Sequence, residues 1–345
     1  MLVSSAFAET SHNYEDLTGP ILVRSPTDLA VGKTYPAIFY FHGTSGQATT
    51  ASMRPYVEGL DCFVVGMSYR KAGFLRLDEG VVEGEIESFR RIRDDLLKRY
   101  PIDPKKCYVA GFSKGGWISA FLVEAEKSVA GAMVLGAGAL AKMPFLDDSA
   151  ARGKAVYIGI GVLEENHINS VRLEERMAGL NALTYLDEWD ETGHTMPQGG
   201  AKGLRQWLQL QLQPEDLSTD DLKGRASERL EEIKDLEAPG ERFLALLRFE
   251  HRPFIRKLGN GAAGVIRRER ETLVRTEPEA AREAEAWRTY QLINARELKS
   301  RKVTDLKRYL SDHQAAAKRF SGTICEDYCA NAAKRLESVL AGSRR

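Results

Sequence analysis

The chain has 345 residues, of which 43% are hydrophobic and 28% are charged, a composition typical of a globular protein with a large buried core. Its 49 Lys and Arg residues balance its 49 Asp and Glu residues, so no nucleic-acid partner is expected. No apolar run approaches the ~18 residues that cross a membrane, so no membrane span is expected either.

The N-terminal segment 1–8 is interpreted apart from the rest of the chain. It ends in "AFA", the small-x-small pattern that precedes a signal-peptidase cut, but it lacks the positive start of a signal peptide. One interpretation is the remnant of a truncated signal peptide, which makes the protein secreted or periplasmic. The alternative is a frayed N-terminus on a cytoplasmic protein.

Short apolar runs alternate with amphipathic stretches as far as residue 212. We expect strands at 19–26, 36–41, 61–67, 106–112, 129–139, 154–161 and 182–189, and helices at 83–99, 115–125, 169–179 and 199–212. Strands that alternate with helices predict βαβ units and a mostly parallel sheet covered on both faces. The first strands of this sheet are candidates for an antiparallel hairpin before residue 36, to which the run 19–26 would contribute. An α/β domain is therefore expected over 9–212.

The composition changes after residue 212. The polar segment 213–221 is expected to be a linker, and 222–345 is charged and poor in strand patterns, which predicts an all-α region. A glycine-rich run at 259–264, "GNGAAG", predicts a flexible interruption between helices. Charges of both signs are mixed here, as on solvated helices, so packing, self-association or a protein partner is the expected role.

The motif "GFSKGG" at 111–116 has the spacing Gly-x-Ser-x-Gly, with a predicted strand before it and a predicted helix after it. In this context the motif is typical of a nucleophile elbow, a tight turn that exposes the hydroxyl of Ser113. The backbone N–H of Lys114, at the start of the helix, is then expected to bind an oxyanion. The Lys114 side chain is expected to be exposed.

A second oxyanion donor is expected from the glycine-rich loop "FHGTSG" at 41–46. The backbone N–H of Thr44 or Gly43 is the candidate donor. His42, in the same loop, is expected to lie at the substrate side and to hold the loop by hydrogen bonds rather than to do chemistry.

His194 is the candidate general base because it follows the last predicted strand, where the order Ser, acid, His requires a base. The acid should follow the strand that lies between Ser113 and His194 in the chain. Glu164 is the first choice, and Glu165, Asp187 and Asp190 are alternatives. Candidate pocket residues are Phe74, Trp117 and His167, with Pro144 and Phe145 at the rim. Core packing explains Trp117 equally well.

The four cysteines do not provide a zinc set of the usual spacing. Cys62 and Cys107 begin apolar runs, so buried thiols are expected there. Cys325 and Cys329 are four residues apart on a predicted helix and are candidates for a disulfide in an oxidising compartment.

The motifs "YFHGTSG", "CYVAGFSKGG", "YIGIGVLEENH" and "TGHTMP" make residues 19–212 resemble the α/β-hydrolases. Within that superfamily, the chain is similar to the carboxylesterase, feruloyl-esterase and polyhydroxybutyrate-depolymerase-like group. The resemblance places the oxyanion loop, the nucleophile, the acid and the His in these four motifs. The family usually has Asp at the acid position, so Glu164 is a departure.

The resemblance implies a serine hydrolase that cleaves a small-molecule or polymer-linked ester through an acyl-enzyme, with no cofactor. A peptidase or an acyltransferase on the same machinery is the first alternative, because pocket shape sets the leaving group and the acceptor. The second alternative is a non-catalytic binding module with the same fold.

Overall fold

The computed structural model describes residues 9–71, 77–139, 143, 146–147, 149–189, 192–197, 201–213, 218–300 and 302–342. The segment 1–8 therefore lies outside the described residues. The chain divides into two compact units. The sheet unit comprises Met1–Ile160, Asn169–Glu188 and Thr195–Leu212, and the helical unit comprises Gly161–Ile168, Trp189–His194 and Gln213–Arg345.

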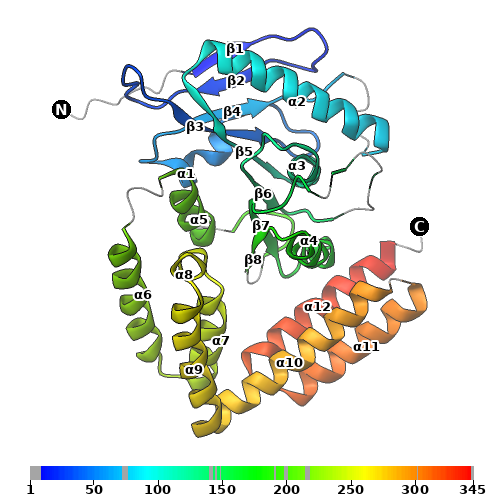
Figure 1. Ribbon diagram of the computed structural model, residues 1–345. Coiled ribbons are helices and arrows are strands. Elements are labelled where there is room, and N and C mark those ends of the chain that lie inside the picture. The colour runs from blue at the N-terminus through cyan, green and yellow to red at the C-terminus, as the bar shows by residue number, and fades with distance from the viewer. Residues whose placement is uncertain are drawn as a thin grey trace, which may run out of the picture. The chain divides into compact units, whose positions relative to one another are not determined.

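The sheet has eight strands in the order β1-β2-β4-β3-β5-β6-β7-β8 (Figure 1). Their bounds are Glu9–His12, Ile21–Arg24, Tyr35–Phe41, Phe63–Met67, Ile102–Phe112, Gly131–Leu135, Ala155–Gly161 and Leu183–Trp189, taken from β1 to β8. Strand β2 pairs antiparallel with β1 and β4, whereas the pairs β3–β4, β3–β5, β5–β6 and β6–β7 are parallel. The carboxyl ends of β3, β5 and β7 therefore lie at the same edge of the sheet.

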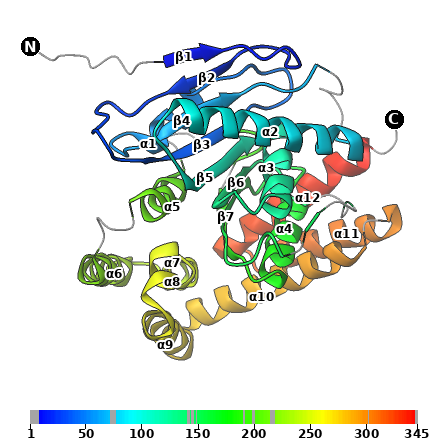
Figure 2. The same cartoon turned by 45° about the horizontal axis from the view of Figure 1, so that its top comes forward.

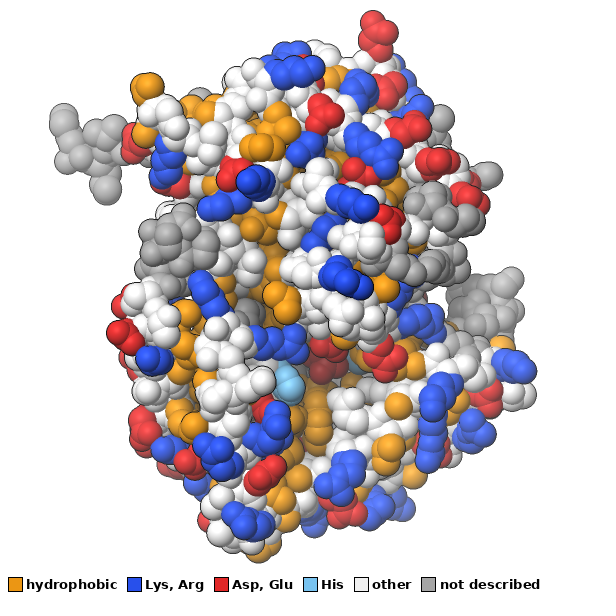
Figure 3. Space-filling model, viewed as in Figure 1, with side chains coloured by type: hydrophobic (Ala, Val, Ile, Leu, Met, Phe, Trp, Pro, Cys, Tyr) orange, Lys and Arg blue, Asp and Glu red, His pale blue; other side chains and the backbone are white. Residues whose placement is uncertain are grey.

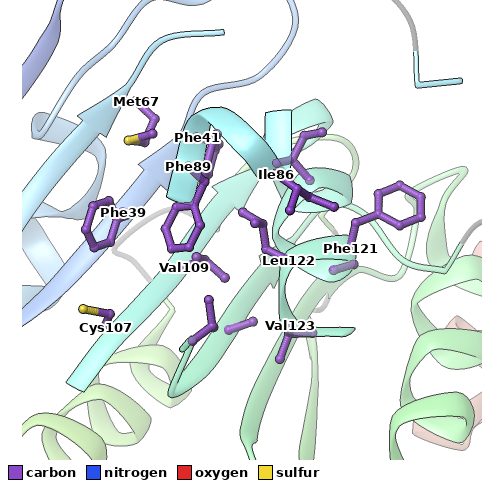
Figure 4. Packing of buried hydrophobic residues seen from close by; sticks show 14 of the residues in the cluster. Phe39, Phe41, Met67, Ile86, Phe89, Cys107, Val109, Phe121, Leu122 and Val123 are labelled. Carbon is purple, nitrogen blue, oxygen red and sulfur yellow. The ribbon is translucent and has the colours of Figure 1, made fainter. Parts of the chain in front are cut away.

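One face of the sheet is covered by α2 (Glu79–Arg99), α3 (Lys114–Ala125) and α4 (His167–Gly179). Alternate residues of the central strands point to this face, including Phe39 and Phe41 of β3 and Val109 of β5 (Figure 4). The Phe39 ring meets the Phe89 ring of α2 edge to face, with centroids 5.1 Å apart. These contacts bury α2 and α3 against the strands that carry the site.

The other face is covered by α5 (Lys202–Leu212), with α1 (Arg54–Val57) beside it (Figure 2). Trp207 of α5 packs against Tyr108 of β5 and Tyr157 of β7, with ring centroids 6.2 and 6.1 Å apart. The Arg205 side chain of α5 donates a hydrogen bond to the carbonyl oxygen of Glu58, at 2.8 Å. Helices therefore cover both faces of the parallel part of the sheet, as the sequence predicts.

The helical unit is built from α6 to α12, whose bounds are Thr219–Lys234, Pro239–Glu250, Pro253–Leu258, Asn260–Thr276, Pro278–Lys299, Val303–Arg319 and Ile324–Gly342. Its core mixes aliphatic and aromatic side chains, and the aromatic ones include Phe243, Tyr290, Tyr309 and Tyr328. The side chain of Ser218 caps α6 by accepting a hydrogen bond from the backbone N–H of Asp221. This cap lies inside the predicted linker 213–221, of which 214–217 is outside the described residues.

The predicted flexible interruption at 259–264 is wrong, because α9 already begins at Asn260. The break is confined to Gly259, whose φ of +85° suits glycine and few other residues. The candidate disulfide is absent, since Cys325 and Cys329 are free thiols. Burial raises the pKa of Cys329 to about 12, which makes this thiol unreactive near neutral pH.

The charge balance of the sequence appears on the surface. Figure 3 shows Lys and Arg side chains interspersed with Asp and Glu over the face in view. Among the residues that the structure describes, no helix has the length and apolar character needed to cross a membrane.

Candidate active site

Ser113 lies at a sharp turn where β5 ends at Phe112 and α3 begins at Lys114. Its backbone has φ of 55° and ψ of −118°, and it is one of three non-glycine residues with positive φ in the described part of the chain. Such a conformation is rare for L-residues and persists only where the surrounding structure imposes it. The backbone N–H of Ser113 donates to the carbonyl oxygen of Leu135 at 2.8 Å, which ties the turn to β6.

The glycines around Ser113 are required by close backbone contacts. A Cβ atom on Gly111 would lie 2.2 Å from the carbonyl carbon of Gly115, and one on Gly115 would lie 1.9 Å from the carbonyl oxygen of Phe41. A Cβ on Gly116 would lie 2.6 Å from the Cβ of Ala137. The Gly-x-Ser-x-Gly-Gly pattern therefore follows from the packing of β3, β5 and α3 at this turn.

The glycine-rich loop after β3 lies beside Ser113. A Cβ atom on Gly43 would lie 3.5 Å from the Cβ of Ser113, so the Gly43 backbone and the serine are neighbours. The loop is closed by a hydrogen bond from the N–H of Gly46 to the carbonyl oxygen of Gly43, at 3.1 Å. Thr44 lies at the exposed tip of this turn.

His194 and Glu164 form a hydrogen-bonded dyad within the helical unit. The Nδ1 atom of His194 lies 2.5 Å from Oε2 of Glu164. The Glu164 side chain is 3% exposed and the His194 side chain is 48% exposed. A carboxylate can only accept, so Nδ1 of His194 carries the donated proton, and this tautomer makes Nε2 the basic nitrogen.

The second carboxylate oxygen of Glu164 has its own partners. Oε1 accepts hydrogen bonds from the backbone N–H and the side-chain amide of Asn166, at 3.3 and 3.2 Å. The alternative acids have other partners, since Glu165 accepts from Ser338 at 2.8 Å and Asp187 accepts from the Tyr157 hydroxyl. Asp190 lies outside the described residues.

No model of a known protein family matches the sequence, and no curated protein matches it. Similar solved structures include a thermostable esterase, with 17% identity over 63% of this chain and 62% of that chain and a TM-score of 0.42. They also include the Bacillus cereus carboxylesterase, with 20% identity over 54% of this chain and 92% of that chain and a TM-score of 0.45. A third is the Pyrococcus horikoshii acylaminoacyl peptidase, with 11% identity over 60% of this chain and 42% of that chain and a TM-score of 0.49.

The chain thus spans less than two thirds of the thermostable esterase and less than half of the peptidase. The fold is decided by the chain's own topology, in which an antiparallel β2 precedes a parallel series of strands and the Ser113 turn follows β5. The chain has the α/β-hydrolase fold. The predicted fold class, a mostly parallel sheet flanked by helices and followed by helices alone, is confirmed.

The Lys114 side chain of this turn is buried, so the prediction that it is exposed is wrong. Lys114 is 5% exposed, and its ammonium group lies 4.4 Å from the centre of the Tyr69 ring. Burial lowers the pKa of Lys114, and the nearby carboxylate of Glu85 acts in the opposite direction. Tyr69 and Glu85 come from segments without any catalytic motif, so the sequence gives no signal for this group.

Glu85 is buried on α2, where its Oε1 accepts a hydrogen bond from the backbone N–H of Arg70 at 3.0 Å. Burial raises the pKa of Glu85 to about 7, and the N–H of Arg70 and the charge of Lys114 limit the rise. The hydroxyl of Tyr69 donates to the carbonyl oxygen of His42. The buried group of Lys114, Tyr69 and Glu85 thereby reaches the start of the glycine-rich loop.

The His42 imidazole is buried within the loop, where Nδ1 donates to the carbonyl oxygen of Gly43 at 2.7 Å. Its ring meets the Tyr69 ring edge to face, with centroids 4.6 Å apart. Burial lowers the pKa of His42, and the charge of Lys114 adds to that effect. His42 is therefore anchored to the loop backbone.

The remaining candidate pocket residues divide into three cases. Trp117 belongs to the buried core cluster of the sheet unit. His167 is buried at the first residue of α4, and its backbone N–H donates to the carbonyl oxygen of Glu164 at 3.0 Å. Phe74, Pro144 and Phe145 lie outside the described residues. Within the described ranges, no group of three or more His, Cys, Asp and Glu side chains could hold a metal ion.

Proposed function

We propose that this protein is a serine hydrolase that cleaves a carboxylic ester through an acyl-enzyme. The observation that carries the proposal is the backbone of Ser113, which has positive φ at a turn where three glycines allow close backbone packing. A strained turn of this kind persists where it presents a side chain for chemistry. Ser113 is the proposed nucleophile, His194 the base, and Glu164 the acid that orients the base.

The proposed reaction has two halves that share the same groups. The Oγ atom of Ser113 bonds to the ester carbonyl carbon while Nε2 of His194 takes the hydroxyl proton, and the carbonyl electrons move onto oxygen. The tetrahedral intermediate collapses, the ester C–O bond breaks, and the leaving alkoxide takes the proton from His194. Water then attacks the acyl-enzyme in the same way, which releases the acid and restores the Ser113 hydroxyl.

The oxyanion is proposed to be held by backbone N–H groups, from Lys114 and from Gly43 or Thr44. The N–H of Lys114 lies at the N-terminus of α3, where helix N–H groups lack intrahelical partners and the dipole favours negative charge. The closeness of Gly43 to Ser113 supports the loop as the second donor.

Labelling with a fluorophosphonate probe tests the nucleophile. The wild-type protein should label covalently and hydrolyse p-nitrophenyl butyrate, and Ser113→Ala should lose both properties. The matched control is Ser227→Ala, which changes an exposed serine on α6 and should retain both. A folded wild type that does not label would refute the hydrolase, and labelling that survives Ser113→Ala would place the nucleophile elsewhere.

The acyl and leaving groups are a separate question. A screen of short-chain, aromatic and acetylated-sugar esters, with matched amides and with alcohols as acyl acceptors, distinguishes an esterase from a peptidase or an acyltransferase. We expect turnover of esters and little turnover of the matched amides.

A further inference from the structure

The loop that carries Glu164 belongs to the helical unit. Residues Gly161–Ile168 and Trp189–His194 group with Gln213–Arg345, although they directly follow strands β7 and β8. Val162 is 4% exposed and belongs to the core cluster formed by α7 and α10 to α12. Leu163 packs against the same cluster. Two consecutive apolar residues therefore anchor the acid loop in the helical core, immediately before Glu164.

The residue after Glu164 is bound to the last helix. The hydroxyl of Ser338, on α12, donates to Oε1 of Glu165 at 2.8 Å. Glu164 and Glu165 thus have different partners, because one carboxylate binds His194 and the other binds α12. Along the chain, Glu164 is therefore preceded by the apolar anchor and followed by the residue that is hydrogen-bonded to α12.

The acid loop is also bound to the loop that carries His194. The backbone N–H of Val162 donates to the carbonyl oxygen of Trp189, and that of Leu163 to the carbonyl oxygen of Thr192, both at 3.0 Å. A Cβ atom on Gly161 would lie 2.0 Å from the Thr192 carbonyl oxygen, so the two backbones are in direct contact. A displacement of the acid loop would therefore displace the His loop.

A buried polar group joins helices of the helical unit. His313 of α11 is fully buried, and its surroundings include the charges of Glu297 and Arg335. The last two form an ion pair with both contacts at 2.7 Å, which joins α10 to α12. A buried pair of this kind holds two helices in one arrangement, since breaking it would leave a buried charge.

We propose that the helical unit is a positioning element of the catalytic apparatus: its core and α12 hold the 161–168 loop so that the Glu164 carboxylate stays directed at Nδ1 of His194. The inference rests on the proposed function, in which this dyad acts on Ser113. Val162 and Ser338 are then positioning residues, which act through Glu164 and touch no substrate.

The expected signature is a loss in kcat with little change in KM, because the dyad supports the transition state and does not bind the ground state. Val162→Ala removes the apolar anchor and should lower kcat for p-nitrophenyl butyrate by about 10-fold or more, since misplacement by 1 Å can cost about 100-fold. Ser338→Ala should lower kcat by roughly 2- to 5-fold, and Ser338→Thr, which keeps the hydroxyl, should restore it.

The matched control is Ile233→Ala, a deletion at a buried residue of α6 that does not belong to this core cluster. It should lower the urea midpoint of unfolding at least as much as Val162→Ala does, while kcat stays near the wild-type value. Equal kcat losses in Ile233→Ala and Val162→Ala at equal destabilisation would overturn the proposal, because the effect would then be a general loosening of the helical unit.

Hydrogen–deuterium exchange separates this inference from the proposed function. Peptides that cover 161–168 and 192–197 should exchange faster in Val162→Ala and Ser338→Ala than in the wild type or in Ile233→Ala. Unchanged exchange would overturn the inference even in an active enzyme. If the wild type fails to label with the fluorophosphonate, the proposed function fails, and exchange alone still decides whether the helical unit holds the acid loop.

Discussion

Replacing Glu164 by Gln tests the dyad most directly, because the substitution keeps the shape of the side chain and removes its charge. Oε1 of Glu164 accepts from two donors of Asn166, so the Gln carbonyl oxygen is expected to take that position. The Gln amide nitrogen, a donor, then faces Nδ1 of His194, which in the wild type donates to Oε2 at 2.5 Å. Two donors cannot pair, so His194 is driven to the tautomer with the proton on Nε2.

That tautomer cannot accept the proton of a serine hydroxyl, and the negative charge that stabilises the imidazolium is also lost. In a Ser-His-Asp protease, the corresponding Asp→Asn change lowers kcat about 10⁴-fold, which corresponds to about 5 kcal/mol. We expect a loss in kcat of roughly 10³- to 10⁴-fold for Glu164→Gln, with KM within about 3-fold of the wild type. Glu164→Asp keeps the charge on a shorter side chain and should lose less activity.

The assay is steady-state hydrolysis of p-nitrophenyl butyrate, with a thermal unfolding scan to verify the fold of each variant. Glu175→Gln is the matched control, since it removes one carboxylate charge from an exposed position on α4 and should leave kcat unchanged. If Glu164→Gln retains more than about a third of the wild-type kcat, the reasoning is refuted and another carboxylate must orient His194.

Three further outcomes follow from buried groups. In Gly115→Ala, the new Cβ would lie 1.9 Å from the Phe41 carbonyl oxygen, so the substitution should destabilise the sheet unit by about 3 kcal/mol and abolish fluorophosphonate labelling. The control is Gly224→Ala on α6, where a Cβ meets no atom within 4 Å, and it should have neither effect. Glu85 has its pKa raised from 4.5 to about 7, so its stabilising contribution is complete below pH 4.5 and is lost by up to about 3 kcal/mol as the pH rises through 7. Urea titrations of Glu85→Gln should show that this loss has disappeared. Burial and Arg335 lower the pKa of His313 from 6.5 to about 4, so its contribution to the free energy of unfolding is complete above pH 6.5 and is lost as the pH falls through 4. His313→Leu should therefore reduce the loss of unfolding free energy at acid pH. An unchanged loss at acid pH would contradict this assignment.

The sequence predicts the sheet unit well because burial decides where its central strands form and local sterics decide where its glycines must stand. Runs such as "PAIFYF" are buried on both faces and form central strands, and Gly111, Gly115 and Gly116 have no alternative at a turn so closely packed. Strand β1, Glu9–His12, has no such apolar pattern, since most of its residues are exposed, so its position was not predicted.

Long-range packing explains what the sequence did not predict. The burial of Lys114 depends on Tyr69 and Glu85, which reach it only in the folded chain. The glycines of 259–264 favour a break, but after Gly259 they continue into α9, which packs against α7 and α10. The assignment of 161–168 to the helical unit likewise depends on side chains of α12 that are about 170 positions away in the chain, as for Glu165 and Ser338.

The anchoring of Val162 and Leu163 in the helical core has a consequence for modularity. A fragment cut off after Leu212 would lose the partners of both side chains and would expose apolar surface at the acid loop. The helices therefore cannot be exchanged or deleted as an independent appendage. A substitution in α10 to α12 is therefore expected to affect the rate of turnover as well as the stability of the fold. In related chains, Val162 and the residues it contacts in the helical core should accordingly vary together.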